Sequence, residues 1–222
     1  MKKKYVNILI IILARKGSVR IQNKNMKIFN KKPLVGWTIE QSLRINYPNK
    51  NVVLSTDSEQ IIHYAKKYKN LMIIKRPRSI STSSSSSLLA IQHVLKKIKF
   101  SGYVILLQPT SPLRKDFDIE NTINFILEGK TPVMSVCKCL HNSSLITSSV
   151  PPQKFTPINN KSQSVYYPNG AIYAAHSSWL ERNPTFYSKN TYTYLMPEER
   201  SIDIDYEYQF DISEMLFKKN NN

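Results

Sequence analysis

One apolar run, residues 7–13 (NILIIIL), constrains the fold of this chain more than any other stretch. A β-branched run without polar alternation is typical of a strand that helices cover on both faces, so we expect a central parallel strand. The loop after it is rich in hydrogen-bond donors, among them Arg15, Ser18, Arg20 and Lys24. Open α/β sheets bind ligands at the carboxyl ends of their strands, where a glycine allows close approach and cations suit polyphosphate. The alternative is a solvated basic turn.

The spacing of this loop excludes two common nucleotide folds. It matches neither the G-x-x-x-x-G-K-S/T phosphate loop nor the G-x-G-x-x-G dinucleotide fingerprint. An anion-binding loop of another kind is therefore expected.

The rest of the chain alternates between strand and helix patterns. Apolar spacing predicts helices over residues 33–45, 58–68, 88–98, 116–127 and 206–218, and strands over 51–57, 71–74, 103–108, 132–139, 169–173 and 191–195. Short β-α-β connections favour a right-handed, doubly wound, mostly parallel sheet with a Rossmann-like architecture. The length of 222 residues fits a single α/β domain, residues 1–222.

Two polar segments interrupt the pattern. Residues 79–87 are almost all serine and threonine, which fits either a flexible linker or an ordered loop that caps the next helix and cradles phosphate; we expect the ordered loop. Residues 140–166 lack periodicity and form either a disordered loop or a dimerisation arm inserted in the domain; we expect the arm.

The net charge of +17 indicates affinity for anions. The excess lysine is spread along the chain without an aromatic-interleaved stripe, so we expect no nucleic-acid partner. Cys137 and Cys139 lack the spacing of a zinc site, and free thiols suit a reducing compartment. The basic start is followed by too short an apolar run for a signal peptide, so a cytoplasmic protein without membrane attachment is expected.

Several separated blocks, taken together, resemble the cytidylyltransferases that activate nine-carbon acidic sugars, the acylneuraminate type. The blocks occur in family order: ILAR at 12–15 with KN at 24–25, LSTD at 54–57, RP at 76–77, LQPTSPLR at 107–114, PNGAIY at 168–173 and SIDID at 201–205. The resemblance covers nearly the whole chain.

The resemblance implies an enzyme that transfers CMP from CTP to the anomeric hydroxyl of a nonulosonic acid and releases pyrophosphate. It also implies assistance by Mg²⁺ and a homodimer in which the arm reaches the partner's site. Attack on an α-phosphorus builds negative charge, which cations and a carboxylate-held Mg²⁺ stabilise.

Site residues are carried over position by position. Arg15, Ser18 and Lys24 match positions that hold the CTP triphosphate, and Asn25, Arg76 and Ser87 match nucleotide-side contacts. Gln108 matches a sugar-side residue, and Asn169 lies in the segment that lines the sugar pocket. Asp203 and Asp205 match the metal-associated carboxylates. The residues expected to act in catalysis are Arg15, Arg20, Lys24 and Asp205.

This chain departs from the family pattern at a few positions. Val19-Arg20 replaces Lys-Gly, so Arg20 is expected to substitute for the missing cation, and Gln22 replaces a proline. Ser83 stands where an aspartate is usual. Asn159 and Tyr167 replace arginines near the sugar pocket, which weakens the case for sialic acid itself.

The Asp-Ile-Asp segment invites a geometric expectation. Side chains alternate in extended backbone, so Asp203 and Asp205 would face one way about 6 to 7 Å apart while Ile202 and Ile204 face the core. A helix N-cap role for the two carboxylates is the alternative. For the whole chain, the alternative is a non-catalytic nucleotide-binding or regulatory homologue. A sugar-1-phosphate nucleotidyltransferase is disfavoured because its Gly-x-Gly-Thr-Arg-Leu loop is absent.

Overall fold

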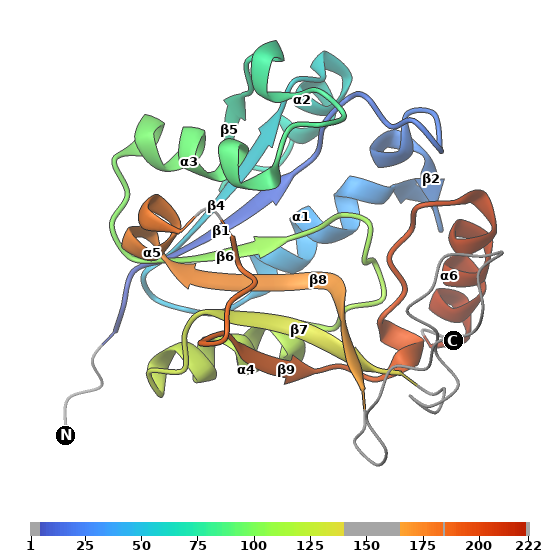
Figure 1. The fold of residues 1–222 in the computed structure, drawn as a ribbon. Coiled ribbons are helices and arrows are strands. Elements are labelled where there is room, and N and C mark those ends of the chain that lie inside the picture. The colour runs from blue at the N-terminus through green and yellow to red at the C-terminus, as the bar shows by residue number, and fades with distance from the viewer. Residues whose placement is uncertain (1–4, 140–164, 184, 221–222) are drawn as a thin grey trace, which may run out of the picture.

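A computed structural model describes residues 5–139, 165–183 and 185–220. Its centre is a seven-stranded sheet in the order β5-β4-β1-β6-β8-β7-β9 (Figure 1). The strands are β1 (Ile8–Leu13), β4 (Lys50–Thr56), β5 (Met72–Lys75), β6 (Tyr103–Leu107), β7 (Val133–Lys138), β8 (Tyr166–His176) and β9 (Tyr192–Leu195). The helices are α1 (Leu34–Arg44), α2 (Glu59–Ala65), α3 (Ser87–Ile98), α4 (Asp116–Leu127), α5 (Ser177–Arg182) and α6 (Glu207–Lys219).

The mostly parallel, doubly wound sheet predicted from the sequence is confirmed. Strands β5, β4, β1 and β6 run parallel, and β8 is antiparallel to both β6 and β7. Almost all of the predicted arm, with Asn159, lies outside the described residues.

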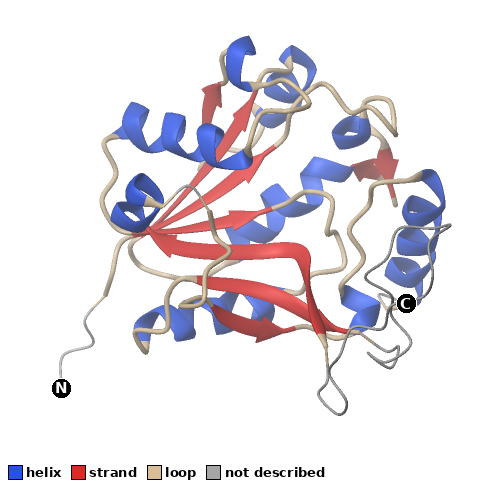
Figure 2. Cartoon of the chain, in the orientation of Figure 1, coloured by secondary structure: helices blue, strands red, loops and turns tan. Residues whose placement is uncertain are grey.

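Helices cover both faces of the sheet (Figure 2). Both faces need cover because the central strand β1 carries apolar side chains on each. Ile8, Ile10 and Ile12 pack with α1, α2 and α4, whereas Leu9 and Ile11 pack with α3 and α5. All five side chains are fully buried, as the unbroken apolar run predicted.

The serine-rich segment is ordered, as expected. It begins in a short 3-10 helix, η2 (Arg78–Ile80), and Ser81 is buried. The Ser86 hydroxyl then caps α3 by accepting a hydrogen bond from the Leu88 N–H, 3.0 Å away. Ser58 caps α2 in the same manner.

Two small features escaped the sequence pattern. Helix α5 has only six residues, too few to establish a period. The hairpin β2 (Ile28–Phe29) with β3 (Lys32–Pro33) turns through Asn30 and Lys31, both at positive φ, with no glycine to signal it. No helix among the described residues is long and apolar enough to cross a membrane.

Candidate functional site

A cavity of 560 Å³ opens at the carboxyl edge of the parallel strands. It lies where the strand order reverses, since β4 and β5 follow β1 on one side and β6 lies on the other. Its polar lining comes from Arg15, Ser18, Arg20, Lys24, Asn25, Arg76, Thr82, Ser83, Ser85, Ser86, Ser87, Gln108, Thr110, Asp203 and Asp205. Most of the predicted site residues therefore meet in one place, including Ser18, Ser87 and Gln108.

Two arginines, Arg15 and Arg76, line the cavity from the ends of different strands. Arg15 follows β1 and donates through Nη1 to the Thr82 carbonyl oxygen, 2.8 Å away. Arg76 follows β5, is 6% exposed, and donates to the hydroxyl and carbonyl oxygens of Ser55. Burial lowers the pKa of Arg76, against the opposing charge of Asp57. No carboxylate among the described residues pairs with this buried guanidinium, which suits it to an anionic ligand.

The first loop is held in place by its own polar contacts. The Asn25 amide donates to the Arg15 carbonyl oxygen at 3.0 Å, and the Lys16 N–H donates to Asp57 Oδ1 at 2.7 Å. Asn25 is therefore placed to shape the loop that carries Arg15. The exposed Val19, one of the departures, also lines the cavity.

The amino end of α3 forms another wall. Ser86 and Ser87 lie at its first turn, next to the Ser83 departure. A helix of this length presents unpaired N–H groups and a partial positive charge at that end, which favours phosphate.

Asp205 bridges the first loop to the segment before α6. Its Oδ2 lies 2.7 Å from Arg20 Nη1 and its Oδ1 lies 3.0 Å from Lys24 Nζ. Lys24 also donates to the Ile204 carbonyl oxygen at 2.5 Å. Tyr206 is the N-cap residue of α6, and Gln209 Oε1 accepts hydrogen bonds from the N–H groups of Asp205 and Tyr206. The structure therefore does not support the N-cap alternative for Asp205.

The isoleucines beside the carboxylates differ from each other. Ile204 is fully buried against Phe29 and Phe210, as expected. The expectation that Ile202 faces the core is wrong, because it is only half-buried and lines a separate cavity of 360 Å³. The segment turns toward α6 here instead of continuing as a regular strand.

Asp203 is the more buried carboxylate. Burial is the main cause that raises its pKa, and the negative charge of Asp205 adds to it. Among the described residues, Asp203 Oδ1 and Thr110 Oγ1 are buried and form no hydrogen bond of good geometry, but the Thr110 hydroxyl is near enough to Asp203 to lower the pKa of that carboxyl against the effect of burial. An orphaned carboxylate oxygen beside a second carboxylate fits Mg²⁺, which needs few protein ligands when waters and phosphates complete its shell. The described residues contain no cluster of three or more metal-ligating side chains, so within this part of the chain the pair Asp203 and Asp205 is the candidate donor set.

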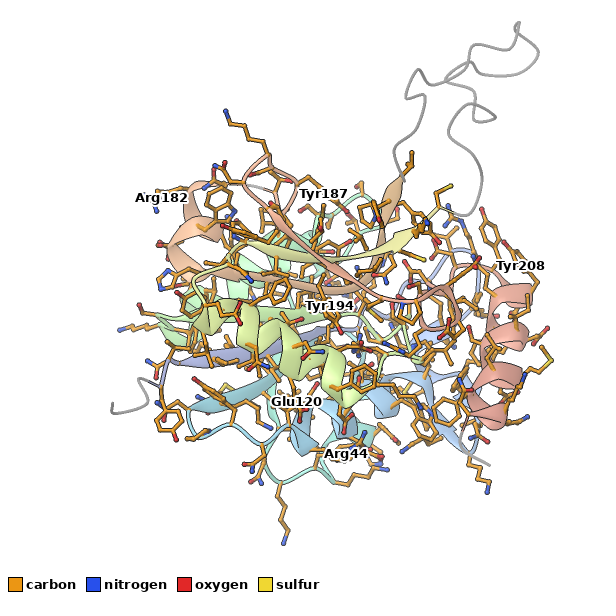
Figure 3. The ribbon with its side chains drawn as sticks, turned by 90° about the horizontal axis from the view of Figure 1, so that it is seen from below. Arg44, Glu120, Arg182, Tyr187, Tyr194 and Tyr208 are labelled. Carbon is orange, nitrogen blue, oxygen red and sulfur yellow. The ribbon has the colours of Figure 1, made fainter. Side chains whose placement is uncertain are left out.

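Asn169 lies outside the main cavity. Its side chain is 3% exposed, and it lines the smaller cavity together with Tyr167, the departure that is 42% exposed. Asp203 lines both cavities. Figure 3 shows Tyr208, another residue of the smaller cavity, on α6 at the edge of the molecule.

The sequence pattern missed the role of Thr110 and Arg114. The Thr110 carbonyl oxygen accepts the Ile204 N–H at 2.8 Å, which ties the loop after β6 to the carboxylate segment. Arg114 is fully buried, and its guanidinium donates to the carbonyl oxygens of Gln108 and Ala171. The rigid Pro-Thr-Ser-Pro block was the available signal for this junction.

The strand order and the cationic cavity at its switch point define a doubly wound α/β protein of the nucleotide-binding class. More specifically, the chain belongs to the cytidylyltransferase family, whose model matches residues 9–220.

Relatives and structural neighbours agree with the family. The N-acylneuraminate cytidylyltransferase of Escherichia coli O18:K1:H7 is 32% identical over 96% of this chain, which spans 53% of that protein. The CMP-N,N'-diacetyllegionaminic acid synthase of Legionella pneumophila is 30% identical, with 97% of this chain and 98% of that protein covered. The chain thus spans about half the length of some relatives and nearly all of others.

Among solved structures, a CMP:2-keto-3-deoxy-manno-octonic acid synthetase complexed with CTP has the same fold. Its TM-score is 0.71 at 16% identity, with 96% of this chain and 99% of that chain covered. At such low identity the likeness speaks for the fold alone.

Proposed function

We propose that this chain is a CMP-sugar synthetase that transfers CMP from CTP to a nonulosonic acid. The observation that carries the proposal is the cavity at the switch point, which combines the cations Arg15, Arg20, Lys24 and Arg76 with the carboxylates Asp203 and Asp205. Cations match a triphosphate, and a carboxylate pair beside them matches the metal that accompanies it.

In the proposed reaction, the anomeric hydroxyl oxygen of the sugar attacks the α-phosphorus of CTP. The bond from the α-phosphorus to its bridging oxygen breaks, pyrophosphate leaves with that oxygen, and the hydroxyl proton is released. The triphosphate is held by Arg15, Arg76 and the amino end of α3. Arg20 and Lys24 stabilise the negative charge that develops on the reacting phosphates. Mg²⁺, when held by Asp203 and Asp205, would neutralise phosphate charge.

The sugar is proposed to be a nonulosonic acid of the legionaminic or pseudaminic kind. Relatives named for both activities match this chain over nearly their full length. Gln108 lines the main cavity, which supports the proposal that it contacts the acceptor sugar. The homodimer, with residues 140–166 as the arm, and the cytoplasmic location are further parts of the proposal.

A regulatory homologue is the second candidate. One observation favours it: Asp205 forms ion pairs with both Arg20 and Lys24. A metal ion would have to compete with these two cations for the carboxylate.

The test is pyrophosphate release from CTP and Mg²⁺ with N-acetylneuraminic, legionaminic, pseudaminic and 3-deoxy-manno-octulosonic acids, each against a control without sugar. Release with one of the nine-carbon acids is expected. Binding of CTP without release for any sugar would support the regulatory candidate instead.

A further inference from the structure

Asn169 has every polar atom of its side chain engaged inside the protein. Its Oδ1 accepts from the Ser135 hydroxyl at 2.6 Å and from the Ala171 N–H at 3.2 Å. Its Nδ2 donates to Ser201 Oγ at 2.8 Å. Asn169 is only 3% exposed and lies on strand β8, which is between β6 and β7 in the sheet. An amide committed in this way has little capacity left to recognise a sugar.

The bond to Ser201 has a fixed direction. Ser201 Oγ donates its single proton to the Pro197 carbonyl oxygen at 2.7 Å, so it meets Asn169 as an acceptor. Only a donor at position 169 satisfies that arrangement, and the Asn169 amide nitrogen is one. Ser201 begins the segment that carries both carboxylates, two residues before Asp203.

The neighbouring backbone also shapes the place of Asp203. Gly170 has φ +77, and a Cβ built there would lie 2.8 Å from Asp203 Oδ2. The β8 backbone therefore closes against the carboxylate with no room for a side chain. On the far side, the Ile204 N–H is tied to the Thr110 carbonyl oxygen. The backbone that carries Asp203 is thus held at Ser201 and at Ile204, while the carboxylate lies against Gly170.

We propose that Asn169 is a positioning residue, which acts through Ser201 to hold the backbone segment that carries Asp203 in place for the metal-nucleotide complex and does not contact the sugar. The inference rests on the proposed function. Outer hydrogen bonds made directly to a metal ligand typically change metal affinity by about 10- to 100-fold when removed. The Asn169–Ser201 bond acts one step further out, on the backbone that carries Asp203, so an effect near the lower end of that range is expected. The role assigned here differs from the sugar-side role that the sequence block implies.

The test compares Asn169→Ala and Ser201→Ala with wild type, and uses Ser42→Ala as the matched control. Ser42 is also fully buried and donates to a carbonyl oxygen, that of Thr38, but it lies in α1 and lines no cavity named here. Mn²⁺ binding is measured by electron paramagnetic resonance with CTP and without sugar, after thermal melting has verified the fold. In parallel, kcat and KM for the sugar are measured at saturating Mg²⁺.

Both site variants should weaken Mn²⁺ binding by roughly 10-fold or more, while KM for the sugar changes by less than about 3-fold. The double variant should be no weaker than the stronger single variant, because the two residues act through one bond. Ser42→Ala should bind Mn²⁺ like wild type. If Asn169→Ala does not fold, Ser201→Ala decides alone.

Wild-type Mn²⁺ affinity in both site variants, or a raised sugar KM confined to Asn169→Ala, would overturn the inference. The same holds if wild type binds no Mn²⁺ with CTP. Failure of the proposed function is visible separately, as a wild type that binds Mn²⁺ and CTP yet transfers CMP to no sugar.

Discussion

Asp205 offers one carboxylate oxygen to each of two cations that differ in exposure. The Arg20 side chain is 53% exposed and Lys24 only 12%. An exposed ion pair is worth about 0 to 1 kcal/mol, so Arg20 can exchange Asp205 for a triphosphate at little cost. The Arg20 guanidinium carbon also lies 4.8 Å from the centre of the Tyr206 ring. Lys24 is held more firmly, by a carbonyl oxygen as well.

Replacing Arg20 with alanine should therefore impair catalysis and spare the fold. The barrier is expected to rise by about 2 to 4 kcal/mol, or roughly 30- to 1,000-fold in turnover at saturating CTP. Lys27→Ala is the matched control, since Lys27 also pairs with a carboxylate, that of Glu207 at the start of α6, but lines no part of the main cavity. Unchanged turnover in Arg20→Ala would refute the idea that Arg20 replaces the missing cation at Val19.

Asp205→Asn separates a metal role from a structural one. The substitution keeps the size of the side chain and leaves the Gln209 cap in place. Turnover should fall by roughly 100-fold or more, with a higher Mg²⁺ requirement, because charge stabilisation by the cation is worth several kcal/mol. Titrating Mg²⁺ against turnover gives the answer, and a near-normal curve would return Asp205 to a structural role.

Asp203→Asn should raise stability while it removes activity. The raised pKa of Asp203 means that folding disfavours its ionised form, so the carboxylate destabilises the ligand-free protein near neutral pH. The gain in unfolding free energy from Asp203→Asn should be largest above the folded pKa. It should shrink as pH falls toward the ordinary value of 3.8, because Asp203 then protonates in both states. Urea titrations from pH 4 to pH 7 measure this gap; a gap that widened on acidification would contradict the expectation.

At the scale of elements, helix α3 has a structural cap that also faces the cavity. Ser86 accepts from the Leu88 N–H and lines the main cavity, whereas Ser58 caps α2 and lines none of the cavities described above. The two serines therefore allow stability and binding to be measured apart.

Ser86→Ala and Ser58→Ala should each destabilise the protein by about 1 kcal/mol, as is typical for a lost N-cap. Only Ser86→Ala should also weaken CTP binding, by a few-fold. Chemical denaturation and calorimetric titration with CTP measure the two effects. Equal CTP affinity in both variants would exclude the α3 amino end from the nucleotide site.

At the scale of the whole molecule, the two halves of the sheet contribute different chemistry. The parallel half carries the cations and the serine loop, and the chain after β8 and β9 returns with the carboxylates (Figure 1). In the half of the sheet that contains β7 to β9, Tyr194 of β9 and Arg200 both donate hydrogen bonds to the buried Asp118 of α4. Tyr194 lies beside that helix in Figure 3. These bonds anchor the return path of the chain.

CTP should stabilise this assembled molecule more than ATP, GTP or UTP. A ligand that binds only the native state raises the melting temperature with its concentration. Thermal melts with each nucleotide and Mg²⁺ are the measurement, and equal shifts with all four would rule out base selectivity.

Local patterns predicted the central strand and the main helices because the residues that become buried are neighbours in the sequence. In β1 they form an unbroken apolar run, and in the helices they recur at helical spacing. The Asn169 bonds could not be predicted in this way, since they join Ser135 and Ser201, which lie far apart in the chain. Pairing of Arg20 with Asp205 depends in the same way on how α6 packs against β2, the strand that follows the first loop, through Phe29 and Phe210. Long-range geometry of that kind has no local signature.

The distance between Arg20 and Asp205 along the chain, 185 residues, also sets the order in which the charges appear during protein synthesis. Translation proceeds from the amino end at about 5 to 20 residues per second, so the cationic loop is made roughly 10 to 40 seconds before its carboxylate partner. Throughout that interval the nascent chain carries Arg20 and Lys24 without Asp205. The cationic loop therefore stays unopposed by Asp205 for as long as the segment between them is being made.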